Sequence, residues 1–288
     1  MDGIIDVGGG LRGIYTAGVY DFLFDNKIDF KYCLGVSAGS ANLVSYIAKQ
    51  RGRSFRFYDQ YSHRKEYMSF NNILKGKPYL SLDYIYSTIS NSDGEDPLDY
   101  AAFSRSESQL IVVATKKDGQ PKYFTKSDMS QDNYDILKAS SALPVFTKPC
   151  LIDGVPYFDG GMGDPLPFKK AFSDGCDRLV VLLTRPLDRP REPQAQLWLA
   201  KLALRKFPKV YEALATRHLR YNAAIAEVKK LIEQGKILVI APKDIGNLQT
   251  LTRDKVILKQ LYYKGYEDAA KIPDFLKADT PLTSLGLS

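Results

Sequence analysis

The sequence has few of the residues that mark disulfide frameworks, metal sites and membrane spans. Its three cysteines are an odd number, and their spacing fits no metal-ligand pattern. We expect Cys33, Cys150 and Cys176 to be free thiols in a reducing compartment. The longest apolar run, Leu179–Leu183, is far shorter than the roughly 18 residues of a membrane span.

The N-terminal segment lacks the basic and apolar regions of a signal peptide. Together with the cysteine usage, this predicts a cytoplasmic protein. Hydrophobic residues make up 44% of the chain and charged residues 25%, which is typical of soluble globular proteins. The chain shows no internal repeat or low-complexity segment, and its 288 residues suffice for a sizeable core.

Excess positive charge is confined to the C-terminal part of the chain. Residues 178–288 contain 20 lysines and arginines against 11 acidic residues, whereas residues 1–177 contain 20 against 22. Such a surplus fits either a solvated helical surface or attraction to an anionic partner. We expect peripheral contact with an anionic membrane as one use of this region, and no nucleic acid partner.

A serine between two glycines follows a β-prone run and opens a helical pattern. The run is Phe30–Leu34, the pattern is Ser40–Lys49, and Gly35-Val36-Ser37-Ala38-Gly39 lies between them. A G-x-S-x-G sequence at a strand-to-helix junction is typical of a nucleophile elbow, where small neighbours let strand and helix approach. The pattern predicts Ser37 as a nucleophile, with a tight turn carrying a solvated serine as the alternative.

A glycine-rich segment, Gly8–Gly13, connects a predicted strand, Ile4–Val7, with a predicted helix, Tyr15–Phe24. Its glycines fit the dinucleotide fingerprint G-x-G-x-x-G, but that fingerprint also requires an acidic residue at the end of the second strand. The second strand here leads into Ser37 instead. Exposed amides of such a turn also bind a phosphate or a developing oxyanion. We expect a right-handed β-α-β unit to bring this segment near Ser37.

The serine needs a base, and the sequence offers few candidates. His63 lies in a tyrosine-rich stretch and His218 lies within a predicted helix, so neither occupies the late loop of a hydrolase triad. Asp159 ends the β run Val155–Phe158 and is followed by two glycines. We therefore favour Asp159 as the base and keep a histidine as the less favoured alternative.

Hydrophobic periodicity predicts an α/β fold with a mixed, mostly parallel central sheet flanked by helices. Residues 51–100 are expected to cover a sheet edge as a lid or pocket wall. Residues 1–186 are expected to form a hydrolase core, and residues 187–288 a mainly helical extension packed on it. The remaining predicted strands are Gln109–Thr115, Lys122–Thr125, Arg178–Thr184 and Lys236–Ala241, and the remaining helices are Asp135–Ala142, Pro165–Phe172, Ala195–Phe207, Lys209–Gln234 and Arg253–Ala270.

Three motifs together resemble the patatin-like phospholipases, which carry a glycine-rich segment, a G-x-S-x-G elbow and a D-G-G/A motif in this order. The matching residues are Gly8–Gly13, Gly35–Gly39 and Asp159-Gly160-Gly161. The segment Ala139–Pro144 also resembles one that precedes the aspartate in this family. The region from Thr252 onward is similar to the C-terminal extension of a bacterial subgroup.

The resemblance implies a three-layer fold and a Ser-Asp dyad, with Ser37 as nucleophile, Asp159 as base and Gly35, Gly39, Gly160 and Gly161 as supporting motif residues. It implies a lipid acyl hydrolase of the phospholipase A or lysophospholipase type, acting on lipid esters without a metal or other cofactor. The implied oxyanion hole is formed by the backbone of Gly8, Gly9, Gly10, Leu11, Arg12 and Gly13. Many members have asparagine near the position of Asp164, which leaves the support of Asp159 open.

Two other functions fit the same residues. A non-catalytic protein could bind a nucleotide or phosphate through the amides of Gly8–Gly13. A lipid-binding or scaffold protein could retain the motifs around a degenerate site.

Overall fold

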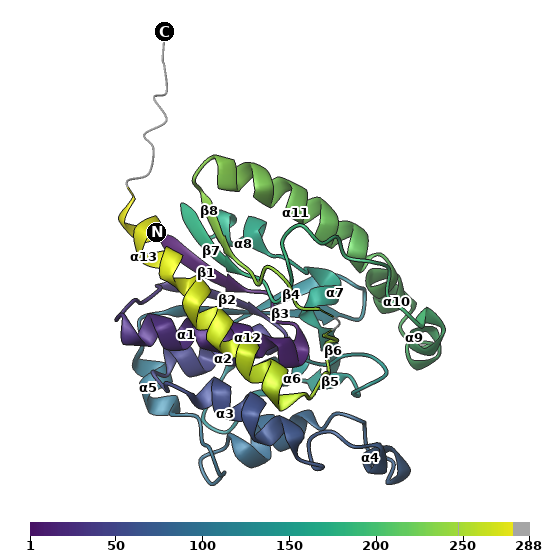
Figure 1. The fold of residues 1–288 in the computed structure, drawn as a ribbon. Coiled ribbons are helices and arrows are strands. Elements are labelled where there is room, and N and C mark those ends of the chain that lie inside the picture. Colours follow the sequence, from purple (N-terminus) through teal and green to yellow (C-terminus); the bar gives the residue numbers. More distant parts are fainter. Residues whose placement is uncertain (247, 279–288) are drawn as a thin grey trace.

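The computed structural model describes residues 1–246 and 248–278. An eight-stranded sheet with the order β5-β6-β3-β2-β1-β7-β8 forms its centre, and β4 also pairs with β3 (Figure 1). The strands are β1 (Asp2–Asp6), β2 (Tyr32–Val36), β3 (Gln109–Lys116), β4 (Pro121–Thr125), β5 (Cys150–Ile152), β6 (Val155–Asp159), β7 (Arg178–Leu182) and β8 (Ile237–Ile240).

The sheet is mixed and mostly parallel, as the sequence predicts. The strands from β3 through β2, β1 and β7 to β8 pair in parallel, while β4, β5 and β6 add antiparallel pairs at one side. Helix α1 (Ile14–Asp25) connects β1 with its parallel neighbour β2, and Ile4 pairs with Cys33. This confirms the predicted β-α-β unit, so the loops after β1 and β2 leave the same edge of the sheet.

Helices bury both faces of the sheet, which explains why the middle residues of its central strands are mostly apolar. On one face, Ile4 packs in a cluster with residues of α1, α2 (Ala38–Ile47) and α12 (Lys255–Asp268). On the other face, Ile5 packs with residues of α8 (Phe168–Ser173) and α11 (Arg217–Glu233). Figure 1 shows α11 and α12 on opposite sides of the strands.

Short helices fill the connections between these layers. They are η1 (Gly10–Gly13), α3 (Arg53–Asp59), η2 (Tyr61–His63), α4 (Phe70–Leu74), η3 (Tyr84–Ile89), α5 (Tyr100–Arg105), η4 (Lys126–Asp128), α6 (Asp135–Ser140), α7 (Gly160–Gly163), α9 (Leu197–Ala203), α10 (Pro208–Ala215), η5 (Ala269–Lys271) and α13 (Ile272–Lys277). The single helix predicted over residues 209–234 is wrong, because the chain breaks at Thr216 into α10 and α11. The other predicted helices and strands form, with bounds shifted by a few residues.

The C-terminal part adds a strand and a helix to these layers. Strand β8 pairs in parallel with β7, and Leu238 lies opposite Val180. Helix α12 crosses α1 so closely that a Cβ at Gly18 would meet the Tyr262 carbonyl. The division at residue 186 remains a prediction. Within the described ranges, no helix has both the length and the apolarity needed to cross a bilayer.

Candidate active site

Ser37 occupies a strained turn between the end of β2 and the start of α2. Its backbone has φ 55° and ψ −133°, a conformation that side-chain-bearing residues rarely adopt. A Cβ at Gly35 would lie 2.5 Å from the Cα of Ser40, and a Cβ at Gly39 would meet the Asp6 carbonyl. Both glycines therefore permit the close approach of strand and helix that the G-x-S-x-G pattern predicts.

Ser140, the last residue of α6, holds this turn in place. The Ser37 amide donates to Ser140 Oγ at 2.8 Å, and the Ser140 hydroxyl donates to the Val113 carbonyl at 2.6 Å. Ser140 is fully buried, so its hydroxyl links the turn to the core of the sheet. The sequence pattern marked this residue only as part of a family segment and gave it no role.

Asp159 ends β6, caps the short helix α7 and is 1% exposed. Its Oδ1 accepts a hydrogen bond from the Gly161 amide at 2.9 Å, and its main-chain carbonyl accepts one from the Thr115 hydroxyl at 2.7 Å. Its Oδ2 is buried and accepts no hydrogen bond from any residue in the described part of the chain. One carboxylate oxygen is therefore fixed, while the other can accept a proton or a hydrogen bond.

Ser37 and Asp159 line one small cavity, which we call the site cavity. The strand order β2-β3-β6 explains their proximity, because Val36 pairs with Val113 and Asp159 pairs with the next residue, Ala114. Two interstrand spacings separate their backbones by about 10 Å. The Ser37 hydroxyl forms no hydrogen bond with the residues that the structure describes.

The glycine-rich segment also borders the site cavity. Gly8, Gly9 and Gly10 line it, and all three have positive φ angles, of 64°, 139° and 61°. The Gly8 amide donates to Asp6 Oδ1 at 2.9 Å, and the Gly8 carbonyl accepts from the Thr184 hydroxyl at 2.6 Å. Within residues 1–246 and 248–278, the amides of Gly9 and Gly10 donate to no acceptor.

The rest of that segment has other contacts. The Leu11 amide, part of the implied oxyanion hole, donates to the Thr250 carbonyl at 2.8 Å and so already has an acceptor. The Arg12 side chain lines the site cavity. A Cβ at Gly13 would meet the Tyr58 hydroxyl, which gives Gly13 a packing role. Among the amides of Gly8 to Leu11, those of Gly9 and Gly10 are therefore the ones without an acceptor in the described residues.

Asp6 lies behind the elbow and is fully buried. Burial raises the pKa of its carboxyl from 3.8 to about 6, although hydrogen bonds from the Gly8 amide and the Tyr20 hydroxyl oppose the shift. Because Asp6 accepts the Gly8 amide and touches Gly39, it connects the glycine-rich segment with the elbow.

The two histidines lie elsewhere. Ser37 borders two cavities, and neither His63 nor His218 lines either of them. Burial, together with the charges of Lys255 and Arg253, lowers the pKa of His63. His218 lies in α11, and its Nδ1 is buried without a hydrogen-bond partner among the described residues. Neither histidine therefore shares these two cavities with Ser37.

The second cavity at Ser37 is mainly apolar, and we call it the apolar cavity. Residues from the stretch 51–100 form much of its wall, which confirms the predicted pocket wall. Its apolar lining includes Phe57, Tyr61, Leu80, Ile85, Ile89, Leu137 and Leu143.

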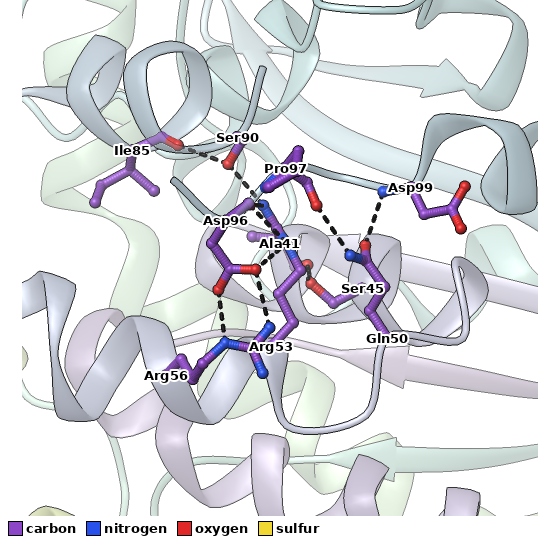
Figure 2. A network of polar contacts seen from close by, with 10 residues as sticks. All are labelled: Ala41, Ser45, Gln50, Arg53, Arg56, Ile85, Ser90, Asp96, Pro97 and Asp99. Atoms are coloured by element: carbon purple, nitrogen blue, oxygen red, sulfur yellow. Dashed lines mark hydrogen bonds and ion pairs between the residues drawn. The ribbon is translucent and has the colours of Figure 1, made fainter. Parts of the chain in front are cut away.

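A buried ionic network ties this wall to α2. Figure 2 shows the guanidinium groups of Arg53 and Arg56 directed at Asp96. Arg56 donates to both carboxylate oxygens of Asp96, at 2.8 and 2.9 Å. Arg53 donates to the Asp96 carbonyl at 2.9 Å and to hydroxyls of Ser45 on α2 and Ser90 after η3, at 3.1 and 2.8 Å.

Asp164 does not hydrogen-bond to Asp159. Its Oδ2 accepts from the Tyr123 hydroxyl at 2.7 Å, its Oδ1 accepts from the Leu166 amide at 3.3 Å, and burial raises its pKa. The departure from the family's asparagine therefore leaves the Gly161 and Thr115 contacts of Asp159 in place.

Three arginines of the site cavity were not identified as candidates from the sequence: Arg185, Arg191 and Arg217. The sequence shows these arginines only as part of the excess of positive charge in residues 178–288. The position of Arg185, three residues beyond the end of β7, was the one available signal, because sites of α/β proteins gather at the carboxyl ends of strands.

Comparisons with known proteins show which family and which relatives the chain is similar to. A family model for patatin-like phospholipases matches residues 7–172, and a model for a domain of unknown function, DUF6363, matches residues 207–277. The uncharacterized protein YjjU of Escherichia coli (strain K12) is 33% identical over 191 residues, which are 65% of this chain and 53% of YjjU.

A solved structure shares the fold. The crystal structure of VipD from Legionella pneumophila matches with a TM-score of 0.54 at 13% sequence identity. The match covers 95% of this chain and 66% of the VipD chain. The chain thus spans about half the length of YjjU and about two thirds of the VipD chain.

Proposed function

Because this chain belongs to the patatin-like phospholipase family, we propose that it is a serine esterase that hydrolyses acyl esters of phospholipids or lysophospholipids. One observation carries the proposal. Ser37, in a strained elbow, and the buried, unpartnered Oδ2 of Asp159 line the same cavity. A nucleophile and a base that are both free of competing partners are what acyl transfer by a dyad requires.

The reaction would proceed in two half-reactions. The Ser37 oxygen attacks the ester carbonyl carbon while Asp159 Oδ2 accepts the hydroxyl proton. The resulting oxyanion accepts hydrogen bonds from the amides of Gly9 and Gly10. The tetrahedral intermediate collapses, the alcohol leaves with the proton from Asp159, and the acyl group stays on Ser37.

Water completes the cycle. Asp159 accepts a proton from the water that attacks the acyl-Ser37 ester, and a second oxyanion forms at the same amides. Its collapse releases the fatty acid and returns the proton to Ser37. Every step uses residues of this chain, with no metal or other cofactor.

The apolar cavity is the proposed place of the acyl chain, because it begins at Ser37 and has an aliphatic and aromatic lining. Burying apolar chain surface there stabilises the complex by about 25 cal/mol per Å². The ionic network around Asp96 would keep the wall of this cavity in place while substrate enters.

We further propose a cytoplasmic enzyme that contacts an anionic membrane peripherally. Helix α4 exposes three apolar side chains, Phe70, Ile73 and Leu74, at 75%, 51% and 84%. The exposed residues Lys75 and Lys77 follow directly. Apolar side chains beside lysines are typical of segments that enter the headgroup region of anionic membranes.

An active-site fluorophosphonate probe tests the proposed function. We expect the probe to label Ser37 covalently, and the label to disappear in Ser37→Ala. The variant Ser127→Ala, in the exposed helix η4, should be labelled like the wild type. Nucleotide binding by a folded chain that the probe leaves unlabelled would favour the non-catalytic alternative.

A further inference from the structure

Four arginines converge on the site cavity from distant parts of the chain. Arg12 follows the glycines after β1, and Arg185 lies just beyond β7. Arg191 belongs to the proline-rich segment that follows, and Arg217 is the first residue of α11. All four residues line the cavity that Ser37 and Asp159 also line.

Positive charge exceeds negative charge around this cavity, with four arginines against one carboxylate. In residues 1–246 and 248–278, none of the four forms a salt bridge, and Asp159 is the one carboxylate in the cavity lining. The Nε atoms of Arg12, Arg185 and Arg217 are buried without a hydrogen-bond partner among those residues. The buried hydroxyl of Tyr221, which lines the same cavity, is unpartnered as well. Several hydrogen-bond donors therefore surround one small space.

The cluster is held in place before any ligand binds. The guanidinium groups of Arg185 and Arg191 both lie over the Tyr221 ring, each 5.7 Å from its centroid. The Asn222 side chain accepts from the Arg191 amide at 2.8 Å and donates to the Arg191 carbonyl at 3.0 Å. Preorganised donors bind a ligand with little further loss of side-chain entropy.

The electrostatic cost of this arrangement points to an anionic ligand. Burial and the other arginines lower the pKa of Arg12 to about 10 and that of Arg191 to about 8. Burial also lowers the pKa of Arg217, which the charge of Asp159 opposes. Arg12 and Arg185 donate to the carbonyls of Leu248 and Pro190, but these neutral acceptors do not balance the positive charge. Partly buried cations without salt-bridge partners cost free energy, and a bound anion would lower that cost.

We propose that Arg185, Arg191 and Arg217, together with Arg12, bind the phosphate group of a glycerophospholipid substrate. The inference rests on the proposed function and identifies the residues that would recognise the phosphate of its substrate. Guanidinium groups match phosphate oxygens in bidentate geometry. An acyl ester at Ser37 could then place its chain in the apolar cavity and its phosphate among the arginines.

The size and charge of the site cavity limit which headgroups it can accept. The cavity offers about 50 Å³ to the centres of water molecules. This is room for roughly three to five waters, close to the five heavy atoms of a phosphate group. The sole carboxylate of the lining, Asp159, is the proposed base, so no further carboxylate of this cavity is left for an ammonium headgroup. We therefore expect phosphatidate-like lipids to be preferred over neutral glycerides.

The test compares two soluble esters in steady-state kinetics of the full chain. Dihexanoyl phosphatidate carries the phosphate, and p-nitrophenyl butyrate lacks it. In Arg191→Gln, kcat/KM for the phosphatidate should fall about 10- to 100-fold more than for the other ester, the usual cost of one charged hydrogen bond. Arg191→Lys should show an intermediate loss of kcat/KM for the phosphatidate, because lysine keeps the positive charge but cannot form the bidentate hydrogen bonds of a guanidinium group.

The exposed neighbour Arg189 provides the matched control. Arg189→Gln removes the same charge two residues away and should leave both rates unchanged. Equal losses on the two esters in Arg191→Gln would overturn the proposal.

Inorganic phosphate separates the two possible sources of the ligand. Calorimetry should show that Ser37→Ala binds inorganic phosphate, and that adding Arg191→Gln weakens the binding at least 10-fold. In the wild type, inorganic phosphate should inhibit phosphatidate hydrolysis competitively. Binding without competition would mean that the cluster holds free phosphate, which contradicts a substrate subsite.

The same measurements test the phosphate subsite and the proposed esterase function separately. A wild type that binds phosphate through Arg191 but hydrolyses neither ester would remove the esterase and keep the anion site. An active esterase that binds no phosphate and shows no Arg191-dependent preference would remove the subsite alone.

Discussion

The pH dependence of folding offers a quantitative test of how the site is built. Asp6 is fully buried behind Gly8 and Gly39, and burial raises its pKa from 3.8 to about 6. A carboxyl with a raised pKa in the folded state favours folding most below pH 3.8, where it is neutral in both states. This contribution is lost as the pH rises through 6.

The size of the effect follows from the shift. A rise from 3.8 to about 6, at 1.36 kcal/mol per pKa unit, corresponds to about 3 kcal/mol. Relative to Asp6→Asn, which cannot ionise, the wild type should therefore lose about 3 kcal/mol of unfolding free energy between pH 3.5 and pH 7. A pH-independent difference in unfolding free energy between the two proteins reflects the changed hydrogen bonds. Only the change of this difference with pH reflects the titration of Asp6.

Urea unfolding of both proteins at intervals of half a pH unit measures this slope. Asp118→Asn is the control, because Asp118 lies in an exposed turn where the Gln120 amide lowers its pKa. Its difference from wild type should be flat above pH 4.5. A flat difference for Asp6→Asn as well, or one that favours the wild type at high pH, would refute a buried carboxyl with a raised pKa.

Three further predictions concern the elbow, the oxyanion donors and the pocket wall. Gly10→Val, at φ 61° with its Cβ 2.5 Å from the Thr250 carbonyl, should lower kcat on a lipid ester by about 10²–10³ while circular dichroism stays native. Ser140→Ala leaves the Ser37 amide without its acceptor and should cost about 1–3 kcal/mol in urea unfolding, together with much of the activity. Asp96→Asn strips the buried Arg53 of its anion and should destabilise by about 3–5 kcal/mol in the same assay. Wild-type stability of Ser140→Ala or Asp96→Asn would contradict the structural role of that residue. Full turnover by Gly10→Val would contradict the placement of the oxyanion donors.

The sequence predicts what is encoded locally. The G-x-S-x-G elbow, the glycine-rich segment and the Asp-Gly-Gly motif each stand at the end of a strand, and strand ends can be located from apolar runs and glycines. Parallel pairing then brings Ser37 and the glycine-rich segment to one edge of the sheet. The mostly parallel sheet, and the proximity of the motifs that form the candidate site, could be predicted for this reason.

Contacts between distant segments could not be predicted in this way. The break at Thr216 separates two helices whose apolar patterns continue across it, so periodicity joined them. The role of Ser140 depends on where α6 packs, and a serine at a helix end carries no such signal. The convergence of Arg185, Arg191 and Arg217 depends on the path of the chain after β7, and a count of charges cannot show it.

The central claim is that a carboxylate, with no imidazole, activates Ser37. Kinetics of four variants on one lipid ester test it most directly, with circular dichroism to verify folding. Ser37→Ala and Asp159→Asn should each lose nearly all activity, whereas His63→Ala and His218→Ala should keep most of it. If a folded histidine variant is inactive and Asp159→Asn remains active, the dyad is wrong.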